Sequence, residues 1–517
     1  MPATSSDTSN APAPSVRPIR TRFAPSPTGL PHIGNYRTAI FAWLAARSTG
    51  GQFLVRIEDT DQKRLVPGAL DSILDGLRWL GLDWDEGPEV GGPYGPYFQS
   101  ERLALYREHA ELLLEKGAAY RCYCSEAELE QMRQEQRARG VPEGYDRRCR
   151  YLTPQQRAER EAAGIVPVVR FAAPETGTTT YHDFLRGDIT VKNEQLDDMV
   201  LLKSDGYPTY NFANIVDDHL MAITHVIRGE EYISSAPRYA QVYRAFGWDE
   251  PEVIHVGLVL APDRSKLSKR HGALPLLEYR TMGYLPQALV NYLVLLGWSY
   301  DDKTEFFTPE RLTEIFDLHR IGSSPSIFDR DRLEWFNGHY IRELTPDQLT
   351  EAAWPFLEAA LPAGTSERLD REYVRAALTL DHERLKTLAQ APEVTRFFFE
   401  EQPEYDASLL LGKSLDAQGG VEALRALIPV LAELRDWSPD ALLKALDEFV
   451  VGHGFIRTKA DGSQVPDRGP VFMLVRVAAS GRKETPGLPE TLAVLGKERT
   501  LKRLRAAEAK LAALIAA

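Results

Sequence analysis

Cysteine is scarce in this chain, with three residues in 517. Three thiols cannot form a disulfide framework, so the sequence predicts a protein of a reducing compartment, the cytoplasm. Long apolar runs are missing as well: none approaches the roughly 18 residues of a membrane-spanning helix, which argues against a membrane protein. Basic residues are outnumbered by acidic ones, and the net charge is −13. This balance argues against indiscriminate nucleic-acid binding but permits a local basic groove.

The first sixteen residues contain no lysine or arginine and no apolar core. They therefore lack the features of a secretory signal, and we expect a disordered tail over residues 1–18. The chain as a whole is 43% hydrophobic and 26% charged, which is ordinary for a globular protein of several domains.

Residues 16–59 have the pattern of a strand, a loop, a helix and a second strand. "VRPIRTRFA" and "QFLVRIED" are strand-like, and apolar residues recur at helical spacing in "YRTAIFAWLAARSTGG" between them. This order predicts a βαβ crossover in a parallel sheet. The Pro- and Gly-rich loop "RFAPSPTGLPHIGN" then lies at the carboxyl end of a strand and at a helix start, where such sheets bind ligands.

The rest of the chain divides into a resumed sheet region and a helical region. A helix is predicted over 98–120, and strands are predicted for "VPVVRF", "DITVK" and "EVIHVGLVLAP". The irregular segment 121–205 is expected to be an insertion into the sheet domain. Further helices are predicted at 346–362, 370–390, 421–435, 438–451 and 488–514.

The last predicted helix is rich in basic residues. A solvated face is the usual explanation for such a run, and a nucleic-acid contact is the less common one. The residues are Lys497, Arg499, Lys502, Arg503, Arg505 and Lys510.

Two short motifs, "PHIGN" at 31–35 and "SKLSKR" at 265–270, carry the chemistry of a nucleotide site. A helix N-terminus offers free N–H groups to a phosphate, and Gly34 permits close approach to the backbone. His32 can donate to a phosphate oxygen, while Lys266 and Lys269 can neutralise charge on a leaving group and Ser268 adds a hydroxyl. Together they predict attack at an α-phosphate with pyrophosphate leaving.

These motifs resemble the two signatures of class I aminoacyl-tRNA synthetases. The strings "RFAPSPTG", "RIEDTD", "GYPTYNFANIVDDHLMAITHVIRGEEY" and "KLSKRHG" look like bacterial glutamyl-tRNA synthetases, and the likeness runs from residue 19 to near the C-terminus. Asn35 stands where the first signature ends in histidine. The resemblance implies an enzyme that activates L-glutamate with ATP and Mg²⁺ and transfers the glutamyl group to tRNA-Glu.

The resemblance also implies the fold, which is a Rossmann-type α/β catalytic domain with an inserted acceptor-binding domain and an all-α anticodon-binding half. A monomer is expected. The implied boundaries are 19–120 and 206–280 for the catalytic halves, 121–205 for the insertion, 281–345 for a helical stem-contact domain and 346–517 for the anticodon-binding domain.

Site residues are carried over where this sequence matches the family motifs. Those that would bind ATP are Thr28, His32, Gly34, Asn35, Lys266, Ser268 and Lys269, of which His32, Lys266 and Lys269 would be catalytic. Those that would bind glutamate are Arg22, Ala24, Ser26, Glu58, Tyr210, Asn214 and Arg228.

Two arginines beside a pocket suit a dicarboxylic amino acid, because a guanidinium pairs bidentately with a carboxylate. The alternative for Arg22 and Arg228 is a structural salt bridge. For Arg228 that partner would be Glu230 or another carboxylate.

The cysteines are similar to a zinc pattern found in the insertion of some bacterial members of the family. The resemblance names Cys122, Cys124 and Cys149 as ligands, with Tyr145 as the fourth and Tyr151 as its competitor. Thiolates are good ligands for zinc. The alternative is three unliganded buried cysteines.

A second class of function is a non-catalytic tRNA-binding or scaffold protein that kept the synthetase fold. Such a protein would be expected to have lost part of the set His32, Lys266 and Lys269. All three residues are present.

Overall fold

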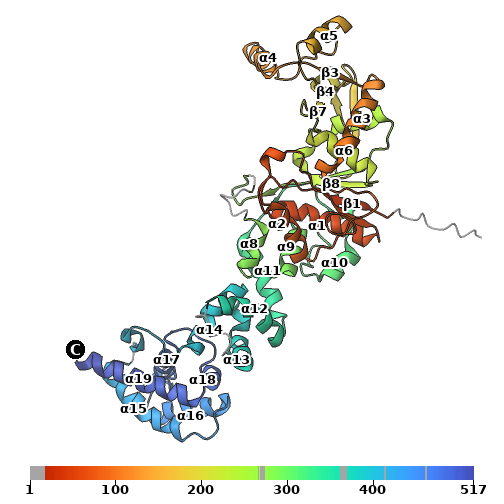
Figure 1. The fold of residues 1–517 in the computed structure, drawn as a ribbon. Helices are drawn as coiled ribbons and strands as arrows, with labels where there is room; N and C mark the ends of the chain where they lie inside the picture. Colours follow the sequence, from red (N-terminus) through yellow and green to blue (C-terminus); the bar gives the residue numbers. More distant parts are fainter. Residues whose placement is uncertain are drawn as a thin grey trace, which may run out of the picture. The chain divides into compact units, whose positions relative to one another are not determined.

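The computed structural model describes residues 18–265, 267, 274–360, 370–412, 415–459, 461 and 463–516. The chain forms two compact units (Figure 1). The first comprises the described residues up to Arg280 together with Pro286–Leu333, and the second comprises Thr281–Leu285 and the chain from Glu334 on.

The predicted βαβ crossover opens the first unit. Strands β1 (Arg20–Phe23) and β2 (Gln52–Val55) are parallel and paired in register, and helix α1 (Ile33–Ser48) connects them. Helix α1 is buried on most sides because it packs against both strands and against α9 (Pro286–Leu295). The sequence-based prediction of a βαβ unit is confirmed over the described residues 18–59.

A four-stranded sheet continues beside β1 in the order β6-β5-β9-β8. Its strands are β5 (Thr178–Asp183), β6 (Gly187–Lys192), β8 (His225–Gly229) and β9 (Glu252–Val256). The Thr224 N–H at the start of β8 donates to the Arg20 carbonyl of β1 at 3.0 Å. Strands from the middle of segment 121–205 therefore lie in one sheet with β8 and β9, and three parallel strands, β5, β9 and β8, end at the same edge.

The remaining elements of this unit include a second sheet, β3-β4-β7, and the helices α2 to α7 and α10. In Figure 1, α4 and α5 lie at one end of the unit, beyond that sheet. The bounds are α2 (Ala69–Trp79), α3 (Leu103–Glu115), β3 (Ala119–Cys122), α4 (Glu126–Ala138), α5 (Pro154–Ala162), β4 (Val168–Phe171), β7 (Val200–Leu202), α6 (Tyr210–Leu220), α7 (Ala236–Phe246), β10 (Val259–Leu260), α10 (Pro309–Ile315) and β11 (Ser326–Ile327).

The helix predicted over 98–120 is shorter in the structure. A 3₁₀ turn precedes α3, which ends at Glu115, and β3 begins at Ala119. Gly117 takes a positive φ of 67° between them, a conformation that ends helices and that glycine adopts at little cost. The predictions of strands at "VPVVRF" and "DITVK" are confirmed by β4 and β6.

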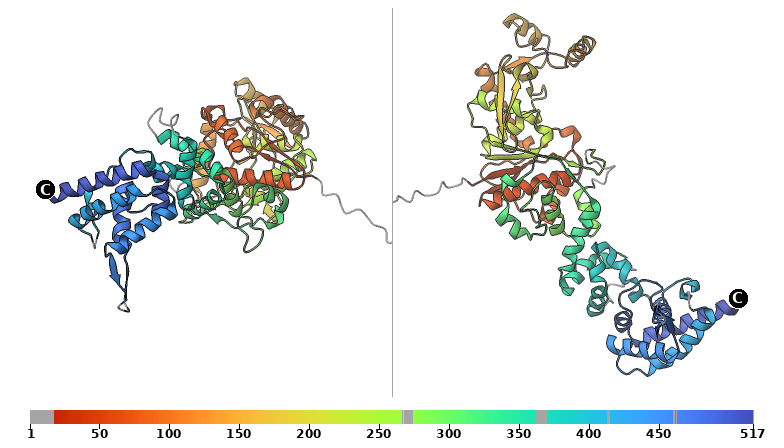
Figure 2. Two further views of the ribbon diagram at one scale, coloured as in Figure 1. Left: turned by 90° about the horizontal axis from the view of Figure 1, so that it is seen from below. Right: turned by 180° about the vertical axis from the view of Figure 1, so that it is seen from behind.

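The second unit is built from helices around one apolar core. Its predicted helix 370–390 stops at Asp381 and gives way to short 3₁₀ turns, and helix 488–514 is broken at Gly496, whose φ is 83°. A short antiparallel hairpin projects from the helices (Figure 2). The bounds are α12 (Pro346–Ala360), α13 (Arg371–Asp381), α14 (Ala391–Phe399), α15 (Ala417–Glu433), α16 (Pro439–Gly452), β12 (Ile456–Thr458), β13 (Gln464–Pro466), α17 (Gly469–Ser480), α18 (Leu488–Leu495) and α19 (Lys497–Ala516), with α8 (Leu276–Thr281) and α11 (Arg330–Arg342) at the unit boundaries.

The basic residues of α19 have two different roles. Lys502 and Arg505 are exposed, as expected of a solvated face. Arg503 is fully buried and donates to the carbonyls of Ala479, Phe397 and Glu400, so for this residue the expectation of a solvated face is wrong. Backbone carbonyls accept from both terminal nitrogens of this guanidinium, which offsets much of the cost of burying it.

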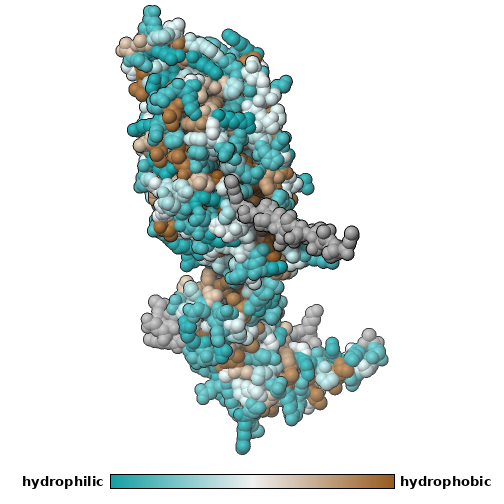
Figure 3. Space-filling view, turned by 90° about the vertical axis from the view of Figure 1, so that its right-hand side faces the viewer, coloured by the Kyte–Doolittle hydropathy of each residue, from teal (hydrophilic) through white to brown (hydrophobic). Residues whose placement is uncertain are grey.

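Hydrophilic residues cover most of the face shown in Figure 3, with hydrophobic ones in small groups among them. Among the described residues, no helix has both the length and the apolar character that crossing a membrane requires.

Candidate active site

A cavity of about 380 Å³ lies in the first unit, where β1 and β8 end and α1 begins. The loop after β1 forms one wall, and Tyr210 of α6 with Tyr232 and the end of β8 forms another. The predicted site residues that line it are Arg22, Ala24, Ser26, Thr28, His32, Gly34, Asn35, Tyr210 and Arg228. Residues expected to hold ATP and residues expected to hold glutamate therefore share one cavity.

Three predicted residues, Lys266, Ser268 and Lys269, lie outside the described part of the chain. Leu267 between them is described and lines the cavity. Glu58 and Asn214 are not part of the lining and lie behind Arg22, to which Asn214 is hydrogen-bonded.

His32 is the N-cap of α1. Its Nδ1 accepts the Gly34 N–H at 3.1 Å, and the Asn35 side chain in turn accepts the His32 N–H at 3.2 Å. This reciprocal capping explains why asparagine serves at position 35. Because Nδ1 is an acceptor, the proton of the neutral ring is on Nε2, which is then a hydrogen-bond donor.

Gly34 has a steric role beside His32. A Cβ at this position would lie 3.0 Å from His32 Cε1 and 3.1 Å from Nδ1, both tighter than normal contacts. The absence of a side chain therefore keeps the imidazole in its capping position, in addition to exposing the helix N-terminus to a ligand.

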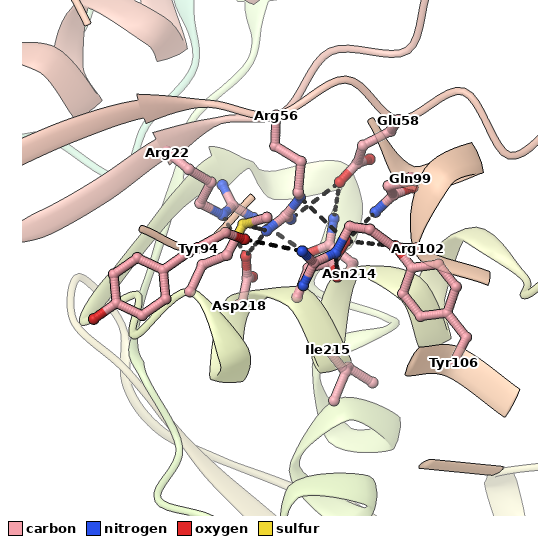
Figure 4. Close-up of polar contacts among 12 residues, drawn as sticks. Arg22, Arg56, Glu58, Tyr94, Gln99, Arg102, Tyr106, Asn214, Ile215 and Asp218 are labelled. Atoms are coloured by element: carbon pink, nitrogen blue, oxygen red, sulfur yellow. Dashed lines mark hydrogen bonds and ion pairs between the residues drawn. The ribbon is translucent and has the colours of Figure 1, made fainter. Parts of the chain in front are cut away.

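A buried group that we call the ionic cluster extends from the cavity wall at Arg22 and comprises Arg22, Arg56, Glu58, Asp217 and Asp218. Arg22, Arg56, Glu58 and Asp218 are labelled in Figure 4. Asp218 Oδ1 accepts from Arg22 Nε at 3.0 Å and from Arg56 Nη1 at 2.8 Å. Arg56 also reaches Glu58 Oε1 at 3.1 Å. Arg56 also lies 3.7 Å from Asp217, so one guanidinium contacts three carboxylates. With Arg102, which pairs with Asp217 at 2.7 Å, three guanidinium groups face the three carboxylates.

Helix α6 supplies Asp217 and Asp218, two of the three carboxylates of this cluster. Tyr210, Asn214 and Asp218 are spaced four residues apart and lie along one helix face. Asn214 Nδ2 donates to Glu58 Oε1 at 2.6 Å. Asp217 precedes Asp218 by one residue and therefore lies on a different side of the helix, where it accepts from Arg102 Nε at 2.7 Å. The residue spacing of α6 therefore positions Tyr210 at the cavity and Asp218 in the ionic cluster.

Burial and charge shift the acidity of these groups in opposite directions. Burial raises the pKa of Glu58 to about 7, although Arg56 and Arg22 lower it. Burial also acts to raise the pKa of Asp218, but Arg22 and Arg56 hold it below its usual value. The Glu58 Oε2 atom is buried and has no hydrogen-bond partner among the residues that the structure describes. Glu58 is therefore the group of this cluster with an unused acceptor.

Arg228 reaches the cavity from β8 with a different set of neighbours. Its Nε donates to His255 Nε2 at 3.0 Å, and the Tyr239 and Tyr232 rings lie 4.7 and 5.4 Å from its guanidinium carbon. Glu230, the alternative partner suggested by the sequence, is instead paired with Arg186 at 3.0 Å. Among the described residues no carboxylate pairs with Arg228, so its charge is available at the cavity.

The three cysteines converge at the start of segment 121–205. Their Sγ atoms lie within 4.8 Å of one another, and Cys122 Sγ lies 3.2 Å from the Tyr145 hydroxyl. Tyr151 is 66% exposed and bonded to Glu175, so Tyr145 is the tyrosine at the cluster. Hydrogen bonds from Cys124 and Cys149 lower the pKa of the Cys122 thiol. Three thiols and a phenol in this arrangement form a donor set suited to zinc.

Comparison with known families agrees with this geometry. Residues 18–335 match the catalytic domain of class I tRNA synthetases of the E and Q type, and residues 348–508 match an anticodon-binding domain. The chain is 46% identical over 496 residues to a glutamate–tRNA ligase of Dehalococcoides mccartyi, covering 96% of this chain and 99% of the relative. The chain belongs to the glutamyl-tRNA synthetase family.

Other members of the glutamyl-tRNA synthetase family support the assignment. The chain is 45% identical to a glutamate–tRNA ligase of Moorella thermoacetica over 94% of this chain and 97% of the relative. The crystal structure of a glutamate–tRNA ligase from Elizabethkingia meningosepticum in complex with its amino acid matches with a TM-score of 0.85 at 33% identity, covering 96% of this chain and all of that one. The predicted fold class is confirmed, and the non-catalytic alternative finds no support.

Membership of the glutamyl-tRNA synthetase family implies ATP and Mg²⁺ in general. Sequence reasoning did not identify Arg56, Asp183, Asp218 or His255, whose contacts organise the site. One signal was available: the pair Asp217-Asp218 directly follows the apolar residues Ile215 and Val216 in one helix, and carboxylates buried in such a place need cationic partners.

Proposed function

We propose that the protein is a glutamate–tRNA ligase that forms glutamyl-adenylate from L-glutamate and ATP and transfers the glutamyl group to the 3′ end of tRNA-Glu. The observation that carries this proposal is the position of Arg228, which lines the same cavity as Arg22 and the His32 loop. Its guanidinium group donates to His255 and has no carboxylate partner among the described residues. The Arg228 guanidinium group suits a carboxylate of a dicarboxylic amino acid. The N-terminus of α1 in the same cavity suits the phosphates of ATP.

In the first step an oxygen of the substrate α-carboxylate attacks the α-phosphorus, and the bond to the β-phosphate breaks to release pyrophosphate. When bound with ATP, Mg²⁺ would supply positive charge that neutralises part of the triphosphate. His32 donates from Nε2 to a phosphate oxygen, and Lys266 and Lys269 stabilise the departing pyrophosphate. No protein nucleophile is required, because positioning and charge stabilisation lower the barrier.

The remaining assignments concern glutamate. Arg228 takes the side-chain carboxylate, and Tyr210 and Arg22 complete the wall. Glu58 takes the α-ammonium group through its unpartnered Oε2, with Asn214 fixing the other oxygen. A tRNA hydroxyl then attacks the adenylate carbonyl, and AMP leaves.

The test is ATP–pyrophosphate exchange with glutamate, with and without tRNA-Glu, followed by charging of tRNA-Glu and tRNA-Gln side by side. We expect exchange that depends on tRNA, as the family resemblance implies. Lys269→Ala should slow activation roughly 10²-fold or more, the effect of removing one transition-state donor. Lys303→Ala, on an exposed loop, is the matched control and should be unaffected. Strong exchange without tRNA, or a normal rate for Lys269→Ala, would contradict these assignments.

We also propose one structural zinc ion held by Cys122, Cys124, Cys149 and Tyr145. The convergence of their donor atoms supports this ligand set. Metal analysis of protein purified without chelators should give about one zinc per chain, and Cys122→Ser should reduce that content. A content far below one would contradict the site.

For the remaining parts we propose that segment 121–205 contacts the tRNA acceptor end and that 346–517 reads the anticodon. We expect the protein to act as a monomer in the cytoplasm, where its three cysteines, none of which forms a disulfide, remain reduced. Light scattering during gel filtration checks the monomer.

A further inference from the structure

Three buried side chains from three neighbouring strands form a chain that ends at the cavity. Arg228 of β8 and His255 of β9 are direct partners in the parallel ladder, and Asp183 ends β5 next to them. Arg228 Nε lies 3.0 Å from His255 Nε2, and His255 Nδ1 lies 2.6 Å from Asp183 Oδ2. We call these residues the relay. Asp183 and His255 are fully buried.

The contacts of the relay determine where its protons are. Asp183 Oδ1 accepts the N–H groups of Leu185 and Arg186, at 3.1 and 2.9 Å. Its Oδ2 faces the imidazole at 2.6 Å and also accepts the His255 backbone N–H at 3.3 Å. A carboxylate only accepts, so His255 Nδ1 carries a proton. Arg228 Nε–H only donates, so His255 Nε2 carries none. His255 is thus neutral and in one tautomer, and burial, which lowers the pKa of His255, acts in the same direction.

This arrangement restrains Arg228. Its Nε is held by His255, and the Tyr232 and Tyr239 rings lie beside its guanidinium group. Its terminal nitrogens have no hydrogen-bond partner within the described part of the chain, and the residue lines the cavity. The Arg228 guanidinium group is therefore fixed through its Nε, while its two terminal nitrogens can donate to a ligand in the cavity.

We propose that Asp183 and His255 are positioning residues that direct Arg228 toward the side-chain carboxylate of the amino acid. The proposal rests on the glutamate-activating function proposed above. It makes Asp183, which belongs to segment 121–205, part of amino-acid selection. The competing explanation is that the relay only ties three strands together, in which case its loss would affect stability and not substrate affinity.

Asp183→Asn separates these explanations with almost no change in volume. The two backbone N–H groups keep the amide oxygen at the Oδ1 position, so the NH₂ group faces His255 Nδ1 and donates to it. The imidazole must then carry its proton on Nε2, where it meets the Arg228 Nε–H. We expect the KM for glutamate to rise roughly 10- to 100-fold, with kcat at saturating glutamate and the KM for ATP changed less than about threefold.

A pair of substitutions at the central residue provides the second test. His255→Gln can keep a carbonyl oxygen near the Nε2 position as an acceptor for Arg228, whereas His255→Leu removes every acceptor. We expect the leucine variant to have the raised glutamate KM and the glutamine variant to recover most of the loss. If one of the variants fails to fold, the others still decide the question.

The matched control is Thr179→Val, in the same strand as Asp183. Thr179 is buried and its hydroxyl donates to Asn193 Oδ1 at 2.6 Å, so the variant removes a buried hydrogen bond outside the relay. It should lower the melting temperature without raising the glutamate KM.

Two results would overturn the proposal. In the first, Asp183→Asn and His255→Leu lower the melting temperature but leave the glutamate KM within twofold of the parent chain. In the second, the parent chain itself activates no glutamate, which would refute the proposed function and the relay's role with it. Measuring the parent chain first distinguishes the two.

Discussion

The ionic cluster and the relay both bring an arginine to the same cavity, but they differ in what holds that arginine. In the cluster, Arg22 and Arg56 share Asp218, and Arg56 also contacts Glu58. In the relay, Arg228 donates to the neutral imidazole of His255. The negative charge of the relay is on Asp183, which contacts His255 and not Arg228. Carboxylate partners neutralise a guanidinium toward other ligands, while a neutral acceptor orients it and leaves its charge available.

This difference predicts different roles for arginines that cannot be distinguished by residue type alone. We expect Arg56 and Asp218 of the cluster to contribute mainly to the stability of the first unit and the relay mainly to substrate affinity, while Glu58 connects the cluster to the substrate. Three substitutions or conditions test the contrast.

The largest effect is expected from Asp218→Ala. The change leaves two buried guanidinium groups without their shared carboxylate, and breaking a buried ion pair in this way costs about 3–5 kcal/mol. Urea unfolding followed by tryptophan fluorescence measures the loss. The exposed pair of Arg78 and Asp75 gives the control: Asp75→Ala should cost less than about 1 kcal/mol. Equal losses from both substitutions would remove the distinction.

Arg228→Ala should have the opposite profile. It removes a charge-assisted bond to the substrate but strands no buried carboxylate, so glutamate kcat/KM should fall roughly 10- to 100-fold with a small change in melting temperature. The KM for ATP should change little. A lower melting temperature with an unchanged glutamate KM would place Arg228 with the structural arginines.

The smallest effect concerns pH and Glu58. Because burial raises its pKa to about 7, the carboxylate that would bind the α-ammonium becomes neutral as the pH falls below that value. The glutamate KM should rise by up to about tenfold per pH unit below 7, and Glu58→Gln should have a high KM that does not depend on pH.

The pH dependence of folding stability that Glu58 causes is opposite to that of glutamate binding: rising pH favours binding and lowers the stability of the fold. A raised carboxyl pKa in the folded state means that the contribution of Glu58 to stability is present below its unfolded value and is lost as the pH rises through about 7. A glutamate KM that does not vary between pH 6 and 8 would contradict the role of Glu58.

Local patterns predicted much of the fold. Residues 16–59 have clear strand and helix periods, and β1, α1 and β2 follow them. The ends of helices were less predictable, because Gly117 and Gly496 interrupt runs whose apolar spacing continues past them. The pairing of β5 with β9 was not predictable from local pattern, since Asp183 and Val253 are joined only by the tertiary fold.

The candidate site was predictable where a motif carried it. The loop 22–35, Tyr210 and Arg228 were identified from short strings, and the structure brings them to one cavity. Asp183 and His255 stand 72 positions apart and have no motif in common, so only the sheet reveals their contact. Arg503 was misassigned because its helix looks amphipathic and the carbonyls that bury it lie in other helices.

Helix α6 has a consequence for how members of the family can diverge. Tyr210, Asn214 and Asp218 serve the site only because they are four residues apart. Deleting or inserting one residue between them would turn every later side chain by about 100° and would send Asp218 away from both arginines. The opposite face of α6 carries Phe212, Ile215 and Val216, which are buried in the apolar core, so we expect only apolar replacements of similar volume there in evolution and changes of length within the helix to be eliminated. Gains and losses of residues should collect in the turns on either side.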